Sequence, residues 1–215
     1  NGIIQELKCL LKTKNIGTDS DQALLLDFQA ALETKPEKAI KLEKDALAQI
    51  ENITADNARL VSNLHANLGG LYRINGHPDL AREHMEKSIS LLDQFNLLHI
   101  NDSIPQIANY AIFLAEQQEP ERGISELQKL SGIITEYHSD ECLDYAKVQE
   151  TLATIYLMTA NLPQAKTHFK RAFKIYEKIW ADELEMIEAK YQEIQELYPQ
   201  IGFCIGKNLS GLLTK

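Results

Sequence analysis

Apolar and small residues recur along this chain at helical spacing, with polar residues between them. One stretch contains Leu68, Leu71 and Tyr72, followed by Ala81, Met85, Ser88 and Ile89. Residues three or four positions apart lie on one face of an α-helix. The stretch therefore predicts two helices, each with one buried stripe, joined by a short turn.

The same pattern returns at a fixed distance. Leu68, Tyr72 and Ala81 are matched by Leu152, Tyr156 and Ala165, each 84 residues later. A copy halfway between them supplies Tyr110, Ala111, Leu114, Pro120, Gly123 and Leu127. A copy further upstream supplies Leu26, Ala30, Pro36, Ala39 and Ala46. The chain is thus predicted to contain four helix pairs with a period of 42 residues.

The period predicts where helices begin and end. First helices are expected over residues 18–34, 56–75, 102–118 and 140–160, with Asp102 and either Ser139 or Asp140 as N-caps. Second helices should start near Pro36, Pro78 and Pro120, because proline is tolerated in the first helical turn. Another first helix is expected over residues 182–198.

Small residues recur where the two helices of a pair should meet. Gly69, Ala111 and Ala153 are expected to face Ala81, Gly123 and Ala165, so that the helix backbones approach closely. One helix pair cannot bury both of its apolar faces, and the copies must therefore stack. The predicted fold is all-α, an α-solenoid of stacked antiparallel helix hairpins.

The period also divides the chain into segments. We expect repeats at 20–61, 62–103, 104–145 and 146–187, with capping helices at 188–215. Residues 1–19 are expected to form a capping helix or the end of a preceding repeat. The first repeat departs from the others, because Asp27 replaces the small residue and Glu43 replaces the large apolar one.

The residues Leu68-Gly69-x-x-Tyr72, followed by a turn, Ala81 and Met85, resemble the tetratricopeptide repeat, whose usual period is about 34 residues. The longer period, with Asn67-Leu68-Gly69 and Asn109-Tyr110-Ala111, is more similar to the kinesin light chain variety of that repeat. The resemblance implies a right-handed superhelix whose first helices line a concave, peptide-binding face.

The resemblance also implies which side chains line that face. They are Asn63, Asn67 and Arg73 from the second repeat, Asn109 and Ile112 from the third, and Lys147, Thr151 and Thr154 from the fourth. Asn67, Asn109 and Thr151 lie one repeat apart and could hydrogen-bond the backbone of a bound peptide. Alternatively, they hydrogen-bond between neighbouring helices and fix the stacking. Ala66 and Gly70 stand where a clamp for chaperone carboxyl termini would need polar residues, which disfavours such a clamp.

Composition limits the class of partner and the location that we expect. A net charge of -9 and a pI near 5.2 disfavour nucleic acid and anionic lipid surfaces. No apolar run is long enough to cross a bilayer, so no membrane association is expected. Cys9, Cys142 and Cys204 are odd in number and widely spaced, which favours a reducing compartment such as the cytoplasm.

Motifs of catalysis are absent from the sequence. The six histidines form no HExxH pattern, and there is no G-x-S-x-G or glycine-rich phosphate loop. The segment from His138 to Cys142 is expected to cap a helix rather than bind metal. We therefore expect no catalytic residues, no metal and no cofactor. The favoured function is a scaffold or adaptor that binds a protein or peptide, the alternative is a regulatory sensor that controls an effector, and the oligomeric state is left open.

Overall fold

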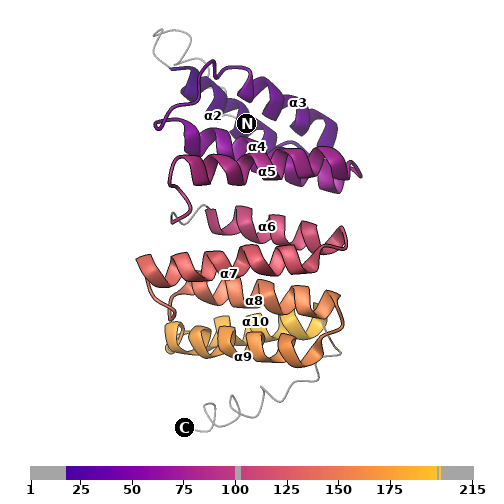
Figure 1. The fold of residues 1–215 in the computed structure, drawn as a ribbon, viewed down its shortest axis with the longest axis vertical. Helices are drawn as coiled ribbons and strands as arrows, with labels where there is room; N and C mark the ends of the chain where they lie inside the picture. Colours follow the sequence, from indigo (N-terminus) through magenta and orange to yellow (C-terminus); the bar gives the residue numbers. More distant parts are fainter. Residues whose placement is uncertain (1–17, 100–102, 198, 200–215) are drawn as a thin grey trace. The chain divides into compact units, whose positions relative to one another are not determined.

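The computed structural model describes residues 18–99, 103–197 and 199. All of the regular elements in this part of the chain are helices, which in chain order are α2 Asp19–Ala31, α3 Pro36–Leu47, α4 Ala58–Ile74, α5 Pro78–Gln94, α6 Ser103–Glu116, α7 Pro120–Tyr137, α8 Leu143–Met158, α9 Leu162–Ile179 and α10 Leu184–Leu197. The predicted all-α fold of helix pairs is confirmed (Figure 1). The expected helix at residues 1–19 lies almost wholly outside the described residues, and so does the tail from residue 200.

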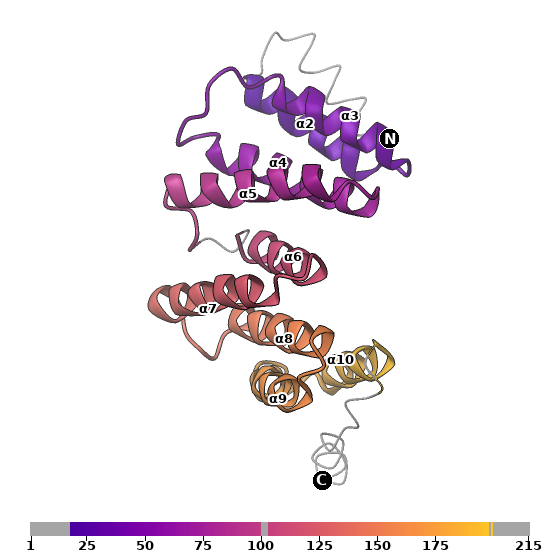
Figure 2. The same cartoon turned by 45° about the vertical axis from the view of Figure 1, so that its right-hand side comes forward.

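The chain divides into two compact units, residues 1–110 and 111–215. In the first unit, α2 packs against α3, α3 against α4, and α4 against α5. In the second, α8 packs against both α7 and α9. Helix α10 lies beside α8 and α9 (Figure 2). The Tyr191 ring of α10 stacks on Phe173 of α9, with 4.2 Å between the ring centroids. The boundary between the units falls within α6.

Helices begin where the sequence predicts. Pro36, Pro78 and Pro120 are the first residues of α3, α5 and α7, where a missing amide hydrogen removes no intrahelical bond. In α9 the proline, Pro163, is the second residue. The helix expected over 182–198 is α10.

The turns inside the helix pairs repeat the same backbone geometry. Gly76, Gln118 and Ala160, spaced 42 residues apart, have φ angles of 76°, 64° and 57°. After each of these residues, the next amide donates back to the last turn of the first helix; His77 N, for example, lies 2.9 Å from Tyr72 O. This is the left-handed helix end of the Schellman type. The first helix pair lacks it, because the equivalent Thr34 is not in the left-handed region.

The N-cap predicted for α8 is wrong. Cys142, rather than Ser139 or Asp140, is the N-cap, and its Sγ accepts a hydrogen bond from Tyr145 N at 3.4 Å. Ser139 Oγ instead accepts from Glu141 N within the preceding turn. The chain makes this turn before it enters the helix, which shifts the cap towards the C-terminus. Asp102, the other predicted cap, lies outside the described residues.

Small residues bring paired helices into contact, as predicted. A Cβ placed on Gly123 of α7 would lie 2.5 Å from the carbonyl oxygen of Ala111 on α6. A Cβ on Gly69 would lie 2.5 Å from Met85 Cγ and 3.3 Å from the carbonyl oxygen of Ala81. Around these contacts the apolar stripes are buried, with Leu64, Leu68, Leu91 and Leu92 in the first unit and Phe113, Leu114, Phe169 and Phe173 in the second.

Replacing Gly123 with alanine should therefore destabilise the protein despite the better helix propensity of alanine. We expect Gly123→Ala to lower the free energy of unfolding by about 1–3 kcal/mol, because the new methyl group meets backbone that cannot move away cheaply. Gly132 lies in the same helix, where an added Cβ meets nothing within 4 Å. Gly132→Ala should raise stability by about 0.5–1 kcal/mol. Urea unfolding of both variants checks this, and equal effects would contradict the close approach.

Candidate functional site

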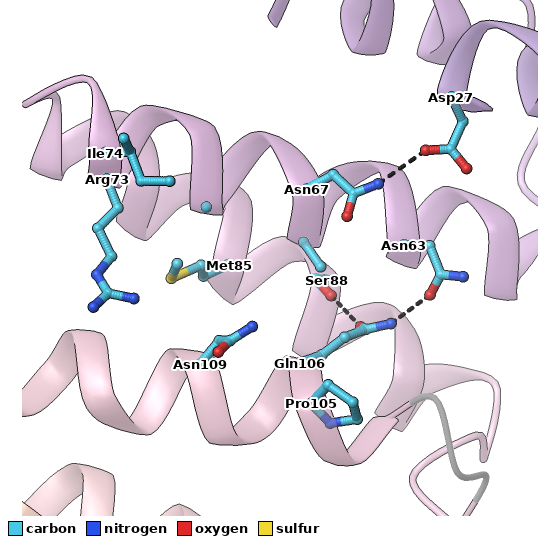
Figure 3. Close-up of a pocket in the computed structure, with 12 residues that line it drawn as sticks. Asp27, Asn63, Asn67, Arg73, Ile74, Met85, Ser88, Pro105, Gln106 and Asn109 are labelled. Atoms are coloured by element: carbon cyan, nitrogen blue, oxygen red, sulfur yellow. Dashed lines mark hydrogen bonds between the residues drawn. The ribbon is translucent and has the colours of Figure 1, made fainter. Parts of the chain in front are cut away.

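A hollow of about 460 Å³ lies in the first unit between α4 and the start of α6. Four predicted groove residues line it: Asn63, Asn67 and Arg73 from α4, and Asn109 from α6 (Figure 3). Asp27 and Gln106, which the prediction did not include, line it as well. The structure thus brings together all three groove residues predicted from the second repeat and one of the two predicted from the third, Asn109.

The Asn67 side chain is engaged by two acidic residues. Its amide nitrogen donates to Asp27 Oδ1 of α2 at 2.9 Å and to Glu43 Oε1 of α3 at 3.2 Å. Of the two roles considered for this asparagine, the described contacts favour the one that links neighbouring helices. Its carbonyl oxygen makes no hydrogen bond within the described part of the chain, so Asn67 can still accept one from a ligand.

The two acids that Asn67 joins are unusually placed. Glu43 is buried, and its Oε2 has no hydrogen-bond partner among the described residues. Burial, followed by the nearby Asp27 charge, raises the pKa of Glu43 to about 8. Burial also raises the pKa of Asp27, against the lowering effect of its hydrogen bonds to Glu43 and Asn67. At neutral pH the pair therefore holds one proton, mainly on Glu43.

A buried polar network supports the other side of the hollow. Ser62 and Ser88 hydroxyls lie 3.1 Å apart, and both donate to Gln106 Oε1, at 2.8 and 2.6 Å. The Gln106 amide in turn donates to Asn63 Oδ1. These bonds tie α4, α5 and α6 together and hold Asn63 at the hollow. A buried network of this kind specifies one arrangement when all of its members are satisfied.

Sequence reasoning missed Gln106, although the repeat contained a signal for it. The equivalent residues one period before and after are Leu64 and Val148, and both are fully buried. A polar residue at an apolar position of the repeat marks a place where the core is replaced by hydrogen bonds. Asp27 and Glu43 stand out for the same reason.

Asn109 keeps the hydrogen-bonding groups of its side chain available at the hollow. It is exposed, and its side chain makes no hydrogen bond within the part of the chain that the structure describes. Beside it, Gly70 leaves open space, since an added Cβ would meet no atom within 4 Å. The hollow therefore offers a side-chain amide next to room for a ligand.

The remaining predicted residues belong to the second unit. Lys147 and Thr151 line a separate hollow of about 310 Å³, together with Glu150, Tyr176 and Lys190. The hydroxyls of Thr151 and Thr154 donate to carbonyl oxygens four residues earlier on their own helix, at 2.9 and 3.1 Å. Their donors are thus used locally rather than offered to a ligand.

The acid in this second hollow is paired with a lysine. Lys190 Nζ lies 2.7 Å from Glu150 Oε1, and the Tyr176 hydroxyl donates to Glu150 Oε2 at 2.7 Å. Burial, followed by the Glu150 charge, raises the pKa of Tyr176 above its usual range, so the hydroxyl remains a donor. Ile112 is partly buried on α6 and lines neither of these two hollows.

Two histidine contacts recur in the repeat and serve packing. His65 Nδ1 lies 2.9 Å from His84 Nδ1, and 84 residues later Gln149 Oε1 lies 2.8 Å from His168 Nδ1. The rings of His84 and His168 stack on Tyr72 and Tyr156. Burial, then the neighbouring His84 and Lys87, lowers the pKa of His65 to about 4, so this imidazole is neutral at pH 7.

The raised pKa of Glu43 predicts an unusual dependence of stability on pH. Between pH 4.5 and 8 the unfolded chain has lost the Glu43 proton whereas the folded protein retains it. This group therefore makes the folded state less stable as pH rises through that window. We expect the stability advantage of Glu43→Gln over the parent protein to grow by about 1–3 kcal/mol from pH 5 to pH 8.

Urea unfolding at several pH values measures this difference. Glu37→Gln, an exposed acid on the same helix, is the matched control and should show no such trend. A constant difference between Glu43→Gln and the parent protein would mean that Glu43 is ionised normally in the fold.

Comparisons with known proteins agree with this geometry. The sequence profile described as tetratricopeptide repeat matches residues 103–178. No curated protein sequence matches the chain. None of the helices that the structure describes is long and apolar enough to span a membrane.

Solved structures show the same fold at low sequence identity. BtubC (BKLC) from P. vanneervenii superposes with a TM-score of 0.66 at 19% identity, over 81% of this chain and 70% of that chain. A putative kinesin light chain from Podosopora anserina, with nearly identical TPR-like repeats, has a TM-score of 0.64 at 15% identity, over 83% and 90% of the two chains. MamA is similar with a TM-score of 0.54 at 14% identity, over 81% and 87%.

Proposed function

The chain is a tetratricopeptide repeat protein, and from this premise we propose that it is a non-enzymatic scaffold that binds a peptide segment of another protein in the hollow of its first unit. Repeats of this type support protein interaction in general. The observation that carries the finer assignment is the gathering of Asn63, Asn67, Arg73 and Asn109 around one hollow. Helical repeats present such side chains at regular intervals, which suits an extended ligand.

The chemistry of the hollow supports a peptide ligand. The Asn109 side chain can both donate a hydrogen bond to a peptide backbone and accept one from it, which an apolar side chain cannot do. The small residues Ala66 and Gly70 leave space above α4 for a ligand. Ile74 and Met85 add apolar area that can contact an anchoring side chain of the ligand. The polar network around Gln106 holds Asn63 in place before any ligand arrives, which limits the entropy lost on binding.

Filling the hollow tests the proposal. Peptides selected from a random phage-displayed library on the parent protein are synthesised with a fluorescent label, and their affinities are measured by anisotropy. Gly70→Leu should weaken their binding at least about tenfold, because the new side chain occupies the peptide site. Asn109→Ala should weaken it about fivefold, as expected for one lost hydrogen bond.

Gly132→Leu is the matched control, since Gly132 is an exposed helical glycine of the second unit with open space at its Cβ. It should leave the affinities unchanged, and circular dichroism should show equal helicity for all variants. The proposal is rejected if Gly70→Leu binds every selected peptide as the parent protein does, or if selection gives no peptide with saturable binding.

A further inference from the structure

The Asp27–Glu43 pair is poorly explained by folding alone. One period later, the equivalents of Asp27 and Glu43 are Gly69 and Met85, which pack closely without charge. Glu43 is only 2% exposed, and its Oε2 is buried without a hydrogen-bond partner among the described residues. Two carboxyl groups that share one amide donor repel each other when both are ionised. An apolar pair would stabilise the fold better.

No cation of the described chain compensates this pair. Neither carboxyl group takes part in an ion pair within residues 18–99 and 103–197. Lys44, the neighbour of Glu43, has its ammonium group 5.6 Å from the centre of the Tyr72 ring. Arg73 lies at the opposite end of the hollow from Asp27 (Figure 3). In the second unit, by contrast, Lys190 pairs with the partly buried Glu150.

Both acids of the pair lie at the walls of hollows in the first unit. Asp27 lines the hollow of about 460 Å³, and Glu43 lines an adjoining hollow of about 400 Å³ that shares Asn67, Gly70 and Asn109 with the first. Because the Asn67 nitrogen points to the acids, its carbonyl oxygen is left as a further acceptor (Figure 3). The site thus combines negative charge with several oxygen acceptors, and the Asn67 amide nitrogen is already bonded to the two acids.

We propose that the Asp27–Glu43 pair, with the Asn67 carbonyl, recognises an arginine side chain of the bound polypeptide. The planar guanidinium group carries five N–H donors and can bond several oxygens at once, whereas a lysine ammonium is a more strongly hydrated point charge. On binding, the positive charge favours ionisation of the second carboxyl group, and its proton is released to the solvent. This inference deepens the proposed function and rests on it for the source of the arginine.

The test uses Nα-acetyl-arginine amide as the probe and Nα-acetyl-citrulline amide as its neutral isostere. Titration of the full chain is followed by NMR at the Asn67 side-chain amide. Arginine amide should bind saturably at millimolar concentration, and citrulline amide should bind at least about tenfold more weakly. Affinity for arginine amide should rise several-fold from pH 6 to pH 8, as the pair gives up its proton more easily.

Two variants separate recognition from a structural role. Asp27→Asn/Glu43→Gln keeps the shape but removes the charge, and Glu43→Met installs the residue found one period later. Both should lose arginine binding at least about tenfold while their melting temperatures stay equal or rise. Glu37→Gln, on the same helix as Glu43, should change neither property.

The inference is overturned if arginine and citrulline amides bind alike, if neither binds saturably, or if the charge-free variant retains binding. These failures differ from failure of the proposed function. Selected peptides that depend on Gly70 but lose nothing when their arginines become citrulline would reject only the arginine site.

Discussion

The close approach of the paired helices α4 and α5, and of α6 and α7, is the constraint on which the rest of the structure depends. At Gly123 the space for even one added methyl group is taken by the Ala111 carbonyl oxygen, and at Gly69 it is taken by Met85. The left-handed turns at Gly76, Gln118 and Ala160 return the chain at a distance that permits this contact. Once the pair is closed, each helix keeps one apolar stripe that only a neighbouring helix can cover.

Because packing constrains the repeated positions so closely, a polar residue at one of them indicates that hydrogen bonds have replaced packing there. Gln106 stands where the neighbouring repeats have a buried aliphatic residue. Its side chain hydrogen-bonds Ser62, Ser88 and Asn63, and these bonds take the place of apolar packing. Asp27 and Glu43 replace a small and an apolar residue, but one carboxyl oxygen remains unsatisfied within the described part of the chain. The polar groups of Gln106 thus find their hydrogen-bond partners within the protein. The Asp27–Glu43 pair lacks such a partner for one oxygen among the described residues, and a cationic ligand would supply it.

The two units treat a buried acid in opposite ways. Glu150 is paired with Lys190, which also contacts Glu193, and it accepts a hydrogen bond from the Tyr176 hydroxyl. The acids of the first unit share the Asn67 amide instead. Electrostatic complementarity chiefly decides which partner is selected rather than how tightly it is held. This difference makes the first unit the one suited to choosing a ligand by charge.

The sequence by itself determined the helices, their pairing and the small residues at their contacts, because these depend on spacing and on proline and glycine, which act locally along the chain. Only the tertiary structure decided which hydrogen-bond partners the polar groups have. Asn67 lies on the predicted groove face, yet its donors turn to Asp27 and Glu43, 40 and 24 residues away, and the N-cap of α8 is Cys142. A period places a residue on a face of its helix, whereas a hydrogen bond requires atoms of different helices to meet within about 3 Å, and that distance is set only when the helices pack.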